Sequence, residues 1–210
     1  VMANDQGLID DFNNDVDIHT KTAAEIYEIP VDEVDKNQRR HAKMVNFAVL
    51  YGMSAHGLSL ATGMSRDQAK IFIDKYFELR KPIREYIDKT LDQALNAGYV
   101  ETIFGRRRPT PDVKSSNFVV REAAKRAAAN MPIQGTEADL MKMAMLEVEK
   151  KLEGGIGLQI LQVHDSILVE APKANAEKVA TILKDTMENI YKLDVKLKVD
   201  VKTGATWGEL

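Results

Sequence analysis

The hydrophobic pattern of this chain changes at Gly154-Gly155, and that change constrains the fold more than any other feature. Before it, apolar residues recur at helical spacing over most of the chain. After it, two short apolar runs flank the triplet His164-Asp165-Ser166, which predicts a β-hairpin with the triplet at its bend. The sequence therefore predicts an α+β protein, mostly helical at first and then an antiparallel sheet backed by helices.

Prolines, glycines and N-cap residues place the expected element boundaries. Helices are expected over residues 17–27, 35–50, 65–79, 82–98, 116–131, 137–152 and 174–191. Strands are expected over residues 99–104, in the hairpin at 158–162 and 167–169, and over 196–202, where charged and apolar residues alternate. Pro132 is expected to interrupt the helix that begins at residue 116, and we place a domain boundary at the start of that helix.

Composition limits the possible chemistry. Cysteine is absent from the 210 residues, which excludes disulfides, thiolate zinc sites, iron-sulfur clusters and cysteine nucleophiles. A hydrophobic content of 44% is enough for a substantial core. No apolar run approaches the ~18 residues that span a bilayer, and the acidic first residues do not resemble a signal peptide. We therefore expect a cytoplasmic protein with no membrane partner.

Charge is divided unevenly along the chain. The formal net charge is only -3, so a nucleic-acid partner would have to be held by a local patch. Residues 1–35 hold ten acidic residues and one basic residue, whereas residues 99–130 hold seven basic and three acidic ones. The near-neutral total therefore hides two segments of opposite charge.

The segment from Arg39 to Gly52 carries four residues at intervals of four. On a helix these would form one ridge, with two cations at one end and two aromatic rings at the other: Arg39, Lys43, Phe47 and Tyr51. Such a ridge could hold a polyphosphate and stack a base. The alternative, which spacing alone favours, is a solvated basic turn followed by two core aromatics.

Two further groups of residues could carry chemistry. Asp165 at a tight turn is either a turn former or an oxygen ligand for Mg²⁺. A serine-hydrolase triad is disfavoured for its triplet, because adjacent residues on a strand point to opposite faces. The second group follows the basic run Arg106 to Arg108: Arg126, Asn130 and Gln134 again lie four apart. Arginine commonly contacts backbone phosphates and amides can read base edges, but a solvated helix face remains the alternative.

Several motifs in a fixed order resemble family A DNA polymerases, the bacterial DNA polymerase I type. The 39–52 segment is similar to the nucleotide-binding helix of that family, with its arginine, a lysine four residues on, and a later Tyr-Gly. The other matching motifs are Asp17-Ile18-His19-Thr20, the run from Tyr99 to Arg108, Asn130-Met131-Pro132-Ile133-Gln134-Gly135-Thr136, and Gln162-Val163-His164-Asp165. Together they cover nearly all of the chain, which makes a chance match negligible.

The resemblance implies a helical fingers domain at residues 1–115, with residues 1–11 linking from the palm, and a C-terminal palm portion at 116–210. His19, Arg39 and Lys43 would bind the triphosphate of an incoming nucleotide, Phe47 would pack on its sugar and base, and Tyr51 would guard the templating position. Primer and template would contact Arg126, Asn130, Gln134 and His164.

The implied reaction is template-directed transfer of deoxynucleotides from dNTPs to a primer 3′ end. It proceeds by phosphoryl transfer with two Mg²⁺ ions, of which Asp165 would be one aspartate ligand and Lys43 would offset phosphate charge. The implied partners are primer-template DNA, dNTPs and the rest of the polymerase chain. The implied roles lie in DNA replication and repair.

Two departures from the family pattern bear on activity. Ser166 stands where the family commonly has glutamate, so no third carboxylate is expected there. The motif with the other essential aspartate ends just before the stretch that Val1-Met2-Ala3 resembles, so we expect the 210 residues to be inert by themselves. The alternatives are a noncatalytic nucleic-acid-binding module and, from the same enzyme class, an RNA-directed or ribonucleotide-using enzyme.

Overall fold

The computed structural model describes residues 1–50 and 52–210, with the side chains of residues 1–48 and 52–210. The chain forms two compact units, Val1–Ile133 and Gln134–Leu210. Within the described ranges, no helix combines the length and the apolar character that crossing a membrane requires. The α+β class expected from the sequence is confirmed, because helices dominate and both sheets are antiparallel hairpins.

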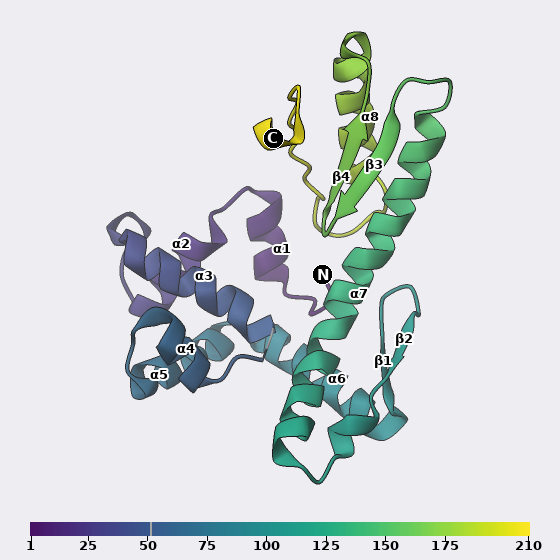
Figure 1. The fold of residues 1–210 in the computed structure, drawn as a ribbon. Coiled ribbons are helices and arrows are strands. Elements are labelled where there is room, and N and C mark those ends of the chain that lie inside the picture. The colour runs from purple at the N-terminus through teal and green to yellow at the C-terminus, as the bar shows by residue number, and fades with distance from the viewer. Residues whose placement is uncertain (51) are drawn as a thin grey trace. The chain divides into compact units, whose positions relative to one another are not determined.

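The first unit is a set of helices with one small sheet, in which β1 pairs with β2. Figure 1 shows its first helices in purple and blue. Its elements in order are α1 (Gln6–Asn13), α2 (Ile18–Tyr27), η1 (Val31–Glu33), α3 (Lys36–Leu50), α4 (Ala55–Thr62), α5 (Arg66–Leu79), α6 (Lys81–Ala97), β1 (Tyr99–Glu101), β2 (Arg107–Pro109), η2 (Pro111–Lys114) and the start of α7 (Phe118–Lys151).

Local signals explain most of the helix boundaries in this unit. Asp17 accepts hydrogen bonds from the first backbone N–H groups of α2, and Ser65 forms a capping box with Gln68 at the start of α5. Gly98 ends α6 in the left-handed conformation, which suits a residue without a Cβ. The helices expected at these places are confirmed, whereas α1 and α4 were not expected.

The core of the first unit lies between α2, α3, α4, α5 and α6. Its most buried members come from all five helices: Ile26, Val45, Leu58, Ala69, Phe72, Tyr76 and Ile83. The Tyr27 ring meets the edge of Phe72 at a centroid distance of 5.4 Å. This packing fixes α3 against α2, and those two helices carry most of the candidate site.

The second unit is a hairpin backed by helices. Its elements after α7 are β3 (Leu158–Val163), β4 (Ser166–Glu170), η3 (Lys173–Asn175), α8 (Ala176–Glu188) and η4 (Trp207–Glu209). Val148 and Leu152 of α7 form a core with Val179 of α8, and the β4 side chains of Ile167 and Val169 pack against it. The expected hairpin is confirmed. Figure 1 shows β3 and β4 beside α8.

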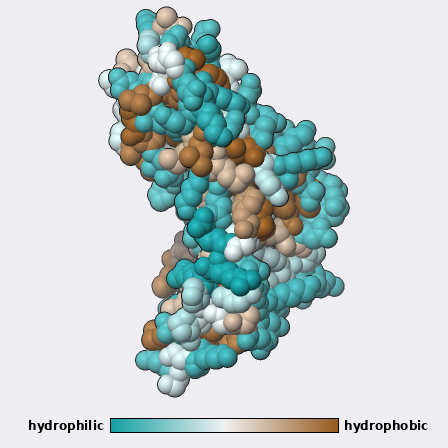
Figure 2. Space-filling view, turned by 90° about the vertical axis from the view of Figure 1, so that its right-hand side faces the viewer, coloured by the Kyte–Doolittle hydropathy of each residue, from teal (hydrophilic) through white to brown (hydrophobic). Residues whose placement is uncertain are grey.

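Several apolar side chains of β3 are exposed. Leu158, Ile160 and Val163 keep 60%, 49% and 39% of their surface exposed. Figure 2 shows apolar patches among a largely hydrophilic surface on one face of the molecule.

The expected interruption at Pro132 is wrong, because α7 runs as one helix from Phe118 to Lys151 with the proline inside it. Proline in a helix interior removes one hydrogen bond and costs about 3 kcal/mol. Packing on both sides supports the helix regardless. Ala128 belongs to a core with Val100 and Val113, and Val148 belongs to the core of the second unit.

The two other expected strands are corrected. The strand expected over residues 99–104 is only three residues long, because the chain turns through Gly105 and pairs with Arg107–Pro109. Residues 196–202 form no strand. Their alternation appears in burial only, with Leu197 and Val199 partly buried and Lys202 exposed. Alternation alone does not make a sheet, since a strand also needs a neighbour for its backbone.

Candidate functional site

Asp17 organises the start of α2. Its carboxylate accepts hydrogen bonds from the backbone N–H of His19 at 3.1 Å and of Thr20 at 3.3 Å. The Thr20 hydroxyl donates to the same carboxylate at 2.7 Å. These bonds satisfy N–H groups that have no partner inside the helix. They hold His19 in the first turn of α2.

The same carboxylate ties α2 to α3. Arg39 Nε lies 2.8 Å from Asp17 Oδ2 and Arg39 Nη2 lies 3.3 Å from Oδ1, so the guanidinium meets both oxygens. Both side chains remain nearly half exposed, at 45% and 46%. The hydrogen bond from Arg39 holds the pKa of the Asp17 carboxyl far below its usual range. Arg39 is therefore held in place and still open to solvent.

His19 lies between Asn46 and Phe47 of α3. Asn46 Nδ2 is 3.0 Å from His19 Nδ1, and the His19 ring is 5.9 Å from the Phe47 ring, centroid to centroid. Partial burial lowers the pKa of His19 below its ordinary value, and the charges of Arg39 and Lys43 lower it further against the opposing charge of Asp17. The lowered pKa therefore favours the neutral imidazole form of His19 at neutral pH.

One face of α3 is thus buried and the other is open. Ala42 and Val45 are buried in the core of the unit, whereas Arg39, Lys43 and Phe47 are exposed. The exposed face brings two cations, a neutral imidazole and a half-exposed aromatic ring together. Cations can hold phosphates and the ring can stack on a planar group, so the face suits a ligand that is polyanionic at one end and flat at the other.

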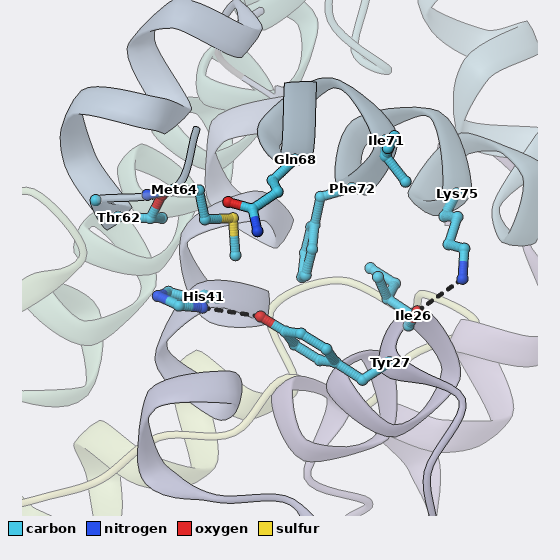
Figure 3. A pocket seen from close by; sticks show the side chains of 10 residues that line it. Ile26, Tyr27, His41, Thr62, Met64, Gln68, Ile71, Phe72 and Lys75 are labelled. Carbon is cyan, nitrogen blue, oxygen red and sulfur yellow. Dashed lines mark hydrogen bonds between the residues drawn. The ribbon is translucent and has the colours of Figure 1, made fainter. Parts of the chain in front are cut away.

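His41 lies on α3 between the two cations but takes no part in this face. Its Nδ1 is 2.9 Å from the Tyr27 hydroxyl, inside a cavity of about 450 Å³ that Figure 3 shows. The cavity is bordered by α2, α3, α5 and the turn before α5, and Lys75 of α5 donates to the Ile26 carbonyl at 3.2 Å. His41 therefore supports the packing between helices and leaves the open face to Arg39 and Lys43.

Within the first unit, Gly52, which follows α3, contacts Arg126 of α7. A Cβ built on Gly52 would lie 2.7 Å from Cγ of Arg126, so the Arg126 side chain of α7 lies directly against this glycine. Gly52 also has a φ of +61°, a backbone conformation that residues with a side chain rarely adopt. Tyr51, the other aromatic residue of the predicted ridge, lies outside the described residues.

Gly52→Ala is therefore expected to destabilise the chain by about 1–2 kcal/mol through backbone strain, and further by displacing Arg126. Gly98→Ala is the matched control, because Gly98 has a φ of +77° but open space around its Cβ position. Urea unfolding of both variants would measure the difference. Equal losses of stability would contradict a tight contact between Gly52 and Arg126.

The remaining predicted residues divide between the two units. Arg126 is exposed and Asn130 is 9% exposed, both in the α7 portion of the first unit. Gln134 begins the second unit and is exposed. His164 and Asp165 form the two-residue turn between β3 and β4.

The hairpin turn presents its aspartate to solvent. His164 has a φ of +51°, and Asp165 and Ser166 are exposed beside it. The Ser166 hydroxyl donates to the Val163 carbonyl at 2.8 Å, which commits it to closing the turn. In the part of the chain that the structure describes, no three His, Asp or Glu side chains gather as a metal site. The Asp165 carboxylate could contribute one ligand to a metal ion.

Sequence reasoning did not assign site roles to Asp17 and Asn46. Asp17 could have been found as an N-cap residue ahead of a helical segment. Nothing local identifies Asn46, because its contact with His19 crosses 27 positions of sequence.

Comparison with known proteins decides the family. The family model described as DNA polymerase family A matches residues 1–209. The chain belongs to DNA polymerase family A. The resemblance seen in the motifs is thereby confirmed.

Relatives within family A support the same conclusion. The thermostable DNA polymerase I of Thermus aquaticus is 47% identical over 206 residues, which is 98% of this chain and 25% of that protein. The DNA polymerase I of Deinococcus radiodurans is 48% identical over 206 residues, or 98% of this chain and 22% of that protein. The chain thus spans about a quarter of the length of the curated relatives it matches.

A solved family A structure also resembles the chain. It is the POL domain of Pol1 from M. smegmatis in complex with DNA primer-template and dNTP. The TM-score is 0.87 at 39% identity, over 94% of this chain and 35% of the solved one.

Proposed function

We propose that this chain forms the nucleotide-binding fingers and part of the catalytic palm of a DNA-directed DNA polymerase. Residues 1–115 would be the fingers and residues 116–210 the palm portion. The observation that carries the proposal is the open face formed by His19, Arg39, Lys43 and Phe47. Membership of family A and the similarity to a polymerase domain holding DNA and dNTP support it.

The open face would bind the incoming deoxynucleotide. Arg39 and Lys43 supply positive charge for the triphosphate, and His19 supplies a neutral hydrogen-bond donor beside them. Phe47, half exposed at the far end of the row, would pack on the sugar and base. Tyr51 would guard the templating position. Positive charge that is already in place where negative charge develops is an effective way to lower a barrier, so Lys43 would act in the chemical step as well.

Primer and template would contact residues of both units. Arg126 suits a backbone phosphate, and Asn130 and Gln134, one and two helical turns further on, suit base edges or sugars. His164, exposed at the β3–β4 turn, would contact the growing end.

Asp165 fits a role as one carboxylate ligand of Mg²⁺, because its oxygens are exposed at a tight turn and Mg²⁺ prefers such ligands. Mg²⁺, when bound, would offset negative charge on the reacting phosphates, in a reaction that uses two such ions. Ser166 offers no carboxylate, and its hydroxyl already bonds to Val163. The palm portion in this chain would therefore supply one metal-binding aspartate, and a second would have to come from elsewhere in the polymerase.

Primer extension with Mg²⁺ and dNTPs tests both parts of this proposal. The 210 residues alone are expected to add no nucleotide. A chimera in which this chain replaces the matching 206 residues of the Thermus aquaticus polymerase is expected to extend the primer. Extension by the isolated chain would contradict its inertness. A folded chimera that binds DNA but adds no nucleotide would contradict the polymerase assignment.

A further inference from the structure

Asn46 of α3 contacts two residues of α2, His19 and the buried Thr22. Its Nδ2 is 3.0 Å from His19 Nδ1, and its amide atoms lie 3.4 and 3.5 Å from the hydroxyl of Thr22, which is only 2% exposed. His19 and Thr22 are three residues apart on α2, so both face α3. Asn46 is thereby held against the ring of His19 by its own packing.

The orientation of the Asn46 amide, with Nδ2 turned towards His19, indicates where the proton of the ring resides. An amide nitrogen only donates hydrogen bonds, so Nδ1 of His19 must accept one with its lone pair. In a neutral imidazole, the proton then sits on Nε2. Nε2 forms no hydrogen bond within the described chain.

We propose that Asn46 is a positioning residue that fixes His19 as the Nε2–H tautomer, so that Nε2–H donates to the triphosphate of the bound nucleotide. The inference rests on the proposed nucleotide role of this face. His19 would contribute a directional hydrogen bond to the triphosphate, and Arg39 and Lys43 would contribute positive charge. The spacing of residues in the sequence does not identify Asn46 as a functional residue.

The charged groups around the His19 ring are consistent with a neutral His19 that donates a hydrogen bond. Arg39 and Lys43 lower the pKa of His19 after burial, and Asp17 acts in the opposite direction. A third positive charge on His19 would have to form beside two existing ones. The neutral ring avoids that repulsion and keeps a donor for the anion.

Asn46→Asp tests the proposal because it reverses the hydrogen bond with little change in shape. A carboxylate at this position accepts a hydrogen bond, so it would draw the proton to Nδ1 and raise the pKa of His19. In the neutral ring, Nε2 would then carry a lone pair towards the triphosphate. We expect the affinity for dNTP to fall about tenfold or more, as for loss of a hydrogen bond to a charged group.

The measurement is ¹⁵N NMR of the histidine rings in the 210-residue chain across a pH series, with His19 assigned from the spectrum of His19→Gln. The unchanged chain should show Nδ1 unprotonated and Nε2 protonated at pH 7.5. Asn46→Asp should show the proton on Nδ1 and a raised pKa. Asn37→Asp, which adds the same charge to an exposed position of α3, should change neither.

A titration with dNTP on the same samples completes the test. An Nδ1–H tautomer in the unchanged chain would overturn the proposal without any variant having to fold. Unchanged dNTP affinity in Asn46→Asp, with a loss in Lys43→Ala, would overturn it as well. An Nε2–H tautomer in a chain that binds no dNTP would support the tautomer assignment and contradict the proposed nucleotide site instead.

Discussion

Asp165→Asn is expected to reduce nucleotide incorporation about a thousandfold in the chimeric polymerase, with little effect on stability. Asparagine is also favoured in tight turns, so the β3–β4 hairpin should keep its shape. What is lost is the negative charge that would hold Mg²⁺ beside the reacting phosphates. Removing one well-placed electrostatic contact of this kind typically costs 10²–10³ in rate, and loss of a metal ligand belongs at the upper end.

Asp200→Asn is the matched control for Asp165→Asn, because it removes the same charge from an exposed aspartate in the same unit. Single-turnover primer extension measures the rate, and gel-shift binding measures DNA affinity. We expect DNA affinity to be retained in both variants. Incorporation at an undiminished rate by Asp165→Asn would contradict the assignment of Asp165 as a metal ligand.

Lys43→Ala is expected to weaken dNTP binding and to lower kcat/KM for incorporation about a hundredfold. The ammonium is exposed on the open face of α3, and alanine is a good helix former, so the helix itself should persist. Loss of a positive charge at the triphosphate should raise KM and also lower kcat, since the charge is needed in the transition state. Steady-state incorporation against dNTP concentration separates the two effects.

Lys70→Ala, an exposed lysine of α5, is the control for Lys43→Ala and should change neither constant. A specific outcome would favour the alternative function. If Lys43→Ala left dNTP affinity unchanged while Arg126→Ala weakened DNA binding, the chain would be better described as a noncatalytic nucleic-acid-binding module.

The helices could be predicted from sequence where a local signal determines the boundary. Asp17, Ser65 and Gly98 each mark a helix end through their own side chain or backbone conformation. Pro132 shows the limit of such rules, because its local cost is outweighed by packing elsewhere along α7. The local rule for proline considers only the neighbouring turn of the helix, so it does not include packing with residues that are distant in the sequence.

The strands and the site depended more on distant contacts. The Arg107–Pro109 strand has a composition that does not favour a strand, and its backbone pairs with Tyr99–Glu101, where Arg108 lies opposite the buried residue Val100. The row of Arg39, Lys43 and Phe47 could be predicted from helical spacing. The contact of Asp17 with Arg39 and the contact of Asn46 with His19 could not, since each requires knowing that α2 packs on α3.

The shared carboxylate of Asp17 gives this pair of helices tolerance to acid. An aspartate without partners takes up a proton at about pH 4. Because the pKa of Asp17 in the folded chain is far lower, its contribution to stability is present above the ordinary value and is lost only as the pH falls through the lowered one. In mildly acidic solution, the link between the start of α2 and Arg39 should therefore persist.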